Sequence, residues 1–73
     1  MNLIERARYY REQHNHPDGV IIIAHGTEYA GWMNELRNPE MWTPGCIAID
    51  PEGNQWEATG GGYRTAERWE VRS

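Results

Sequence analysis

The first residues of the chain alternate between apolar and polar with the period of an α-helix. One helix face recurs every three or four residues, at Leu3, Ala7, Tyr10 and His14, with Ile4 at its edge. Asn2 and Glu5 have the spacing of a capping box, which predicts that the helix begins there. Pro17 and Gly19 interrupt the pattern, so we expect the helix to end before them. Its charged residues, Arg11 among them, are expected to lie in water.

A different pattern begins at residue 20. Val20–Ile23 is β-branched and apolar at every position, which is typical of a central strand covered on both faces. His25 and Gly26 suit a turn, after which residues 27–33 are expected to return as a second strand. Gly31 inside that return strand indicates a bulge or a close approach of another group to the backbone.

The middle of the chain predicts one short helical turn and one hairpin. Asn38 and Pro39 favour a single helical turn over residues 39–42, since they suit its cap and its first position. Residues 46–59 alternate in polarity on either side of the segment 50–53, which has the residue preferences of a β-turn. We therefore expect a β-hairpin there.

Residues 67–72 predict a last short strand. Trp69 and Val71 share one of its faces, and Trp69 is expected to point toward the core together with Trp56. The elements add up to an α+β fold, with one N-terminal amphipathic helix packed on a small antiparallel sheet of about four to five strands. Short connections favour a meander within one domain, residues 1–73.

Three consecutive glycines, Gly60–Gly62, raise the possibility of a phosphate-binding loop. Such a loop needs a lysine followed by serine or threonine, and the chain contains no lysine. The spacing also differs from the dinucleotide-binding pattern of separated glycines after a strand. The glycines are therefore expected to form a flexible connection between two strands, which carries Tyr63 and Arg64 outward.

Composition restricts the functions that the chain can have. A chain of 73 residues has little room for an enclosed active site, and we expect no cofactor. The formal charge of -4 opposes direct binding to nucleic acid. The longest apolar run, residues 20–24, is far shorter than the roughly 20 residues that span a bilayer, so no membrane association is expected. The single cysteine, Cys46, cannot form an internal disulfide, which favours a cytoplasmic location.

Residues that support catalysis or metal binding are few. His14, His16, His25 and Cys46 lack the spacing of a tetrahedral metal site, and we expect no metal. Cys46 begins an apolar strand, where a free cysteine is typically a small core residue. Glu57 and Glu70 are able to face one another across strands, but carboxylates on strand faces are most often simply solvated. We expect that the protein is not an enzyme.

Aromatic and arginine residues are more abundant than a small core requires. The chain has four Trp and four Tyr but no Phe, and Trp, Tyr and Arg dominate the energetics of protein interfaces. One interpretation is that all four tryptophans belong to the core or its rim. The other is an exposed patch that binds a protein partner and is formed by Arg37, Met41, Trp42, Tyr63 and Arg64.

The leading hypothesis is a small non-catalytic interaction module that occludes a surface of another protein. In size and acidic composition the chain resembles the small orphan proteins of phages and mobile elements, including anti-CRISPR and anti-restriction inhibitors. That resemblance implies a nucleic-acid-handling host complex as partner. Alternatives are an aromatic sheet face that binds single-stranded nucleic acid or a small ligand, and a minimal enzyme using His25 and Cys46. The protein is expected to be a monomer or a homodimer.

Overall fold

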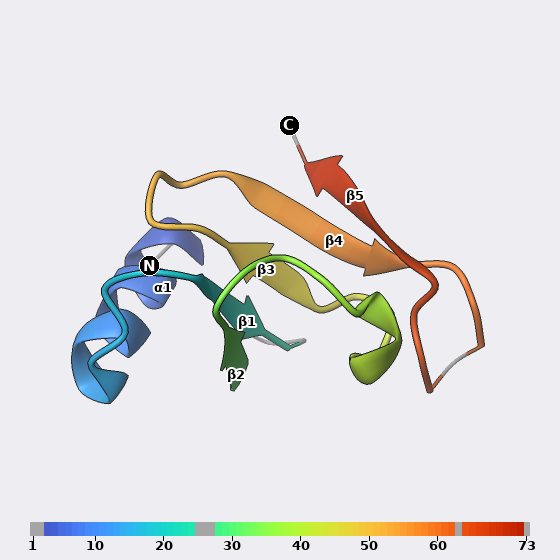
Figure 1. Ribbon diagram of the computed structural model, residues 1–73, viewed down its shortest axis with the longest axis horizontal. Coiled ribbons are helices and arrows are strands. Elements are labelled where there is room, and N and C mark those ends of the chain that lie inside the picture. The colour runs from blue at the N-terminus through green and yellow to red at the C-terminus, as the bar shows by residue number, and fades with distance from the viewer. Residues whose placement is uncertain (1–2, 25–27, 63, 73) are drawn as a thin grey trace.

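The computed structural model describes residues 3–24, 28–62 and 64–72. The elements in chain order are α1 (Leu3–His14), β1 (Val20–Ile23), β2 (Tyr29–Met33), η2 (Pro39–Met41), β3 (Ile47–Ile49), β4 (Gln55–Thr59) and β5 (Arg68–Arg72). One helix lies against a five-stranded antiparallel sheet, so the predicted α+β fold is confirmed (Figure 1). Four residues to which the sequence assigned a cap, a turn or a partner contact lie outside the described ranges: Asn2, His25, Gly26 and Tyr63.

The strands are arranged in the order β2-β1-β3-β4-β5. Only β3, β4 and β5 follow one another as a meander, whereas the first hairpin places β2 at the outer edge and β1 beside β3. The order follows from burial, because every residue of β1 and β3 is buried while β2 exposes Ala30. Strands that are apolar on both faces are most stable at the centre of a sheet.

Each face of the central strands is covered by a separate hydrophobic layer. On one face Ile21, Ile23, Ile47 and Ile49 pack with Ala7 of α1. On the other face a second buried group is covered by partly buried side chains from the segment that follows β2 and from the last two strands. These side chains are Leu36, Trp42, Trp56 and Trp69. The prediction of a central strand covered on both sides is confirmed for β1.

Arg11 departs from its predicted role as a solvated charge. Its Nη1 donates hydrogen bonds to the carbonyl oxygens of His16 and Asp18, both at 3.2 Å. Its Nη2 donates to the carbonyl oxygens of Gly19 and Ile49, both at 2.8 Å. One side chain thus connects the end of α1, the turn before β1 and the end of β3. Burial lowers the pKa of Arg11, against the opposing effect of two nearby aspartates.

Candidate protein-binding surface

Two connections meet at the end of the molecule that lies away from α1: the segment 34–42 and the segment 60–67 (Figure 1). The backbone N–H of Ala66 donates to the carbonyl oxygen of Trp42 at 2.8 Å. Nε1 of Trp69 donates to the carbonyl oxygen of Arg37 at 3.2 Å. These bonds bring η2 and β5 together, although the two elements are distant in sequence.

The helical turn at η2 forms because of its first residues. Asn38 adopts a left-handed conformation with φ of 47°, and Pro39 supplies the fixed φ that begins the turn. The N–H groups of Met41 and Trp42 donate to the carbonyl oxygens of Asn38 and Pro39, each at 3.0 Å. The predicted turn is confirmed, and it leaves the side chain of Met41 69% exposed.

Trp42 packs inward instead of lying in the open patch to which the sequence assigned it. A Cβ atom built at Gly31 would lie 2.6 Å from Cη2 of Trp42, so the indole ring rests on the bare backbone of β2. The predicted close approach at Gly31 is confirmed, and a bulge lies in the same strand between the partners of Ile22 and Ile23. The indole is half-buried, and its buried Nε1 has no hydrogen-bond partner among the described residues. Trp42 is therefore a residue of the core rim.

The glycine segment joins β4 and β5, as predicted, and makes specific backbone contacts at Gly60 and Gly61. Gly60 and Gly61 adopt positive φ angles of 75° and 69°, which favour glycine. The N–H of Gly61 donates to a carboxylate oxygen of Glu67 at 3.2 Å, and the N–H of Glu67 donates to the carbonyl oxygen of Thr59 at 2.8 Å. A Cβ atom at Gly61 would clash with the carbonyl oxygen of Thr65, so this position requires glycine.

Val71 is the most exposed large hydrophobic residue of the described chain, at 77%. The sequence placed it on the core-facing side of the last strand with Trp69, and it is paired with Trp56 across the sheet. The alternation of polarity therefore gave the correct face. It gave no information on coverage, because β5 is an edge strand and Val71 lies near its end.

These observations define a candidate site, which we call the η2–β5 surface. It consists of Arg37, Met41, Arg64, Trp69 and Val71. Arg37 and Arg64 are exposed, Trp69 is half-buried, and Met41 and Val71 are largely exposed. Arg37 and Met41 lie on the segment 34–42 and Arg64 lies on the segment 60–67, and the Ala66–Trp42 and Trp69–Arg37 hydrogen bonds join these segments. The structure places Trp42 in the core rim, and Tyr63 lies outside the described residues.

The opposite face of β4 and β5 is polar. Glu57 and Glu70 are paired across the two strands, as the sequence predicted. Thr59 Oγ1 donates to Glu70 Oε2 at 2.6 Å, and Arg68 Nε donates to the same oxygen at 3.0 Å. The hydrogen bond from Thr59, followed by that from Arg68, lowers the pKa of the Glu70 carboxyl. Glu70 is an exposed side chain in a surface network, and its carboxylate is held in the charged form.

The histidines that the structure describes stack on aromatic rings at the β2 edge. His14 lies parallel to Tyr29 with 4.2 Å between ring centroids, and His16 lies parallel to Trp32 at 4.3 Å. Within the described ranges no group of three or more His, Cys, Asp or Glu side chains is placed to hold a metal ion. Cys46 is buried, as expected of a core cysteine.

Comparison with family models, with curated proteins and with solved structures found no match for the chain. None of the helices in the described part of the chain combines the length and the apolar character needed to span a bilayer. The fold defines a small α+β domain, and the proposals for its function rest on its surface.

Proposed function

We propose that this domain is a non-catalytic protein-interaction module and that it binds its partner through the η2–β5 surface. The observation that carries the proposal is the exposure of Met41 and Val71 at 69% and 77%, on two elements that the hydrogen bond from Trp69 to the Arg37 carbonyl brings together. Each such side chain gains about 1.5 to 3 kcal/mol when a partner removes it fully from water.

The composition of this surface fits the pattern of interface hot spots. Trp69 supplies a large ring fixed by its hydrogen bond to the Arg37 carbonyl, and Met41 supplies a flexible apolar side chain that adapts to a partner. Arg37 and Arg64 are exposed and lie on the two connections that meet here. The outer side of β5 also offers backbone groups, because β5 is an edge of the sheet.

A finer proposal names the class of this inhibitor and its partner. An acidic domain of this size and composition suits an inhibitor of the phage or mobile-element type, such as an anti-CRISPR or anti-restriction protein. It would act by occluding a surface of a nucleic-acid-handling host complex. The charge of -4 with seven arginines interspersed favours occlusion over mimicry of DNA, since a mimic requires an unbroken acidic stripe.

Affinity capture with matched baits tests the proposal. The wild type, a Met41→Ser/Val71→Ser double variant and a Tyr9→Ser control are used to capture proteins from a lysate of the native host. Tyr9 is 49% exposed but lies on α1, so it controls for the loss of an exposed apolar side chain elsewhere. We expect the wild type and the control to retain the same partner and the double variant to lose it. Thermal denaturation of the three baits verifies that each is folded.

Equal capture of the same proteins by all three baits would show that the η2–β5 surface is not the binding site. A partner with no role in nucleic-acid handling would leave the interaction module in place and overturn only the finer proposal. The nucleic-acid alternative predicts instead that single-stranded DNA binds at low salt and dissociates as salt rises. The described structure does not favour it, because all four tryptophan rings lie half-buried against the two core layers.

A further inference from the structure

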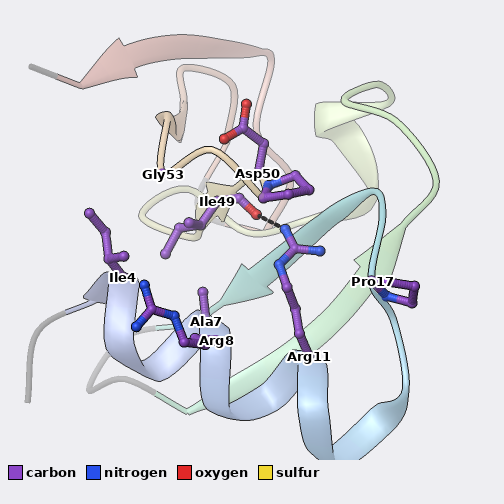
Figure 2. Close-up of a pocket in the computed structure, with 9 residues that line it drawn as sticks. Ile4, Ala7, Arg8, Arg11, Pro17, Ile49, Asp50 and Gly53 are labelled. Atoms are coloured by element: carbon purple, nitrogen blue, oxygen red, sulfur yellow. Dashed lines mark hydrogen bonds between the residues drawn. The ribbon is translucent and has the colours of Figure 1, made fainter.

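A pocket of about 210 Å³ lies between α1 and the turn that joins β3 to β4 (Figure 2). It is at the end of the molecule opposite η2 and shares no residue with the η2–β5 surface. Part of its wall is apolar and is formed by Ile4, Ala7 and Ile49. The polar part is formed by two arginines of α1, Arg8 and Arg11, and by Asp50.

The two arginines differ in how many of their donors are already used. Arg11 has five N–H donors, and the four on its terminal nitrogens are directed at the carbonyls described above. Its Nε–H is the donor that has no acceptor among the described residues. Arg8 is exposed, and none of its donors has an acceptor within the described ranges. The two residues are three positions apart on one helix, a spacing that places side chains on the same face.

The nearby carboxylate of Asp50 does not satisfy these donors. One of its oxygens accepts the N–H groups of Glu52 and Asn54 at 3.0 and 2.8 Å, and the other accepts Nδ2 of Asn54 at 3.0 Å. Figure 2 shows this carboxylate turned away from Arg8 and Arg11. The pocket therefore offers unused cationic donors beside apolar side chains, within a chain whose net charge is -4.

We propose that this pocket binds a small monocarboxylate with a short branched apolar tail. The carboxylate accepts hydrogen bonds from the Arg8 guanidinium and from Nε–H of Arg11, because a planar fork of donors suits a carboxylate. The tail lies on Ile4, Ala7 and Ile49. The volume is below the range of about 300 to 1,000 Å³ that is usual for drug-sized ligands, so the ligand must be smaller.

A titration followed by amide NMR shifts tests this assignment, with isovalerate as the probe. Matched probes separate the two parts of the site: 3-methylbutan-1-ol has the same tail without the charge, and inorganic phosphate has charge without a tail. We expect isovalerate to bind with a Kd of about 1 mM, as befits so small a ligand, and to shift the amides of Ala7 and Gly53. Both other probes should bind at least about tenfold more weakly.

Variants locate the binding. Arg8→Gln should weaken isovalerate binding by about tenfold or more, the loss typical of a charged hydrogen bond. Arg72→Gln, which removes the same charge from an exposed position on β5, should leave the affinity unchanged. Three results would each overturn the proposal: no saturable shift with isovalerate, equal affinity for the alcohol, or unaltered affinity in Arg8→Gln. Tighter binding of phosphate would also overturn it, because the apolar wall would then be irrelevant. None of these results bears on the η2–β5 surface.

Discussion

Replacing Arg11 with Met would remove the connection between the end of α1, the turn before β1 and the end of β3. Methionine keeps the helix propensity and much of the apolar stem of arginine but donates no hydrogen bond. Four carbonyl oxygens lose a donor, of which those of Gly19 and Ile49 have the shortest contacts at 2.8 Å. Ile49 is only 1% exposed, so water has poor access to that part of the chain.

The expected loss follows from these two short bonds. A hydrogen bond to a charged group contributes about 1.5 to 3 kcal/mol. We discount the bond to Asp18, because water replaces the donor at that exposed carbonyl, and the bond to His16, because it is longer at 3.2 Å; we also subtract the desolvation of the partly buried guanidinium. The result is a loss of about 2 to 3 kcal/mol. A domain of 73 residues typically has a free energy of unfolding of about 4 to 11 kcal/mol, so the loss is a large fraction.

Urea denaturation followed by tryptophan fluorescence measures this free energy of unfolding. Arg8→Met is the matched control, because Arg8 is on the same helix and has no partner among the described residues. Its stability should remain within about 0.5 kcal/mol of the wild type. Arg11→Lys should be intermediate, since an ammonium cannot reproduce the planar fork. If Arg11→Met is as stable as Arg8→Met, the four hydrogen bonds make no net contribution and the reasoning is wrong.

Two further predictions concern the sheet. Gly31→Ala should lower the free energy of unfolding by about 1 to 3 kcal/mol, because the added Cβ would lie 2.6 Å from the Trp42 ring. Gly62→Ala is the control and should leave the free energy of unfolding unchanged, because no atom lies within 4 Å of its Cβ. Equal urea midpoints for the two variants would contradict the packing of Trp42 against Gly31. The pKa of Glu70 is lowered in the folded state, so its stabilising effect is present above its unfolded-state pKa and is lost as the pH falls through the folded pKa. The stability of the wild type should therefore exceed that of Glu70→Gln near neutral pH, and the difference should shrink on acidification in parallel urea titrations; a difference independent of pH would refute this role.

The sequence predicted those features that depend on neighbouring residues. The amphipathic period of α1, the buried run of β1 and the turn between β3 and β4 are all encoded within short segments, and the structure confirms them. The order of strands was not predictable, because the pattern of β2 specifies a strand but not its neighbours. The sequence-based prediction put Trp42 in an exposed patch for a similar reason, since its ring contacts Gly31 of β2, an element that the local pattern around Trp42 does not reveal.

The residues of the candidate sites were likewise predictable only where the local sequence determines their position. Exposure of Met41 followed from its place on a short turn, but exposure of Val71 depends on how far the covering segment extends over an edge strand. The role of Arg11 depends on carbonyls that lie up to 38 positions away, and no periodic pattern carries that information. Alternation therefore identifies the face of a residue, while tertiary contacts decide whether the face is covered.

The arginines of this acidic domain differ in the groups that they bind. Arg68 forms an ion pair with Glu70 at 3.0 Å. Arg11 instead binds backbone carbonyls, and Arg8 retains unused donors at the pocket. Because ion pairs on an exposed surface contribute little, arginines that are not neutralised by carboxylates keep donors available for structure or for ligands. As proposed, Arg8 at the pocket and Arg37 at the η2–β5 surface supply local positive charge despite the net charge of -4.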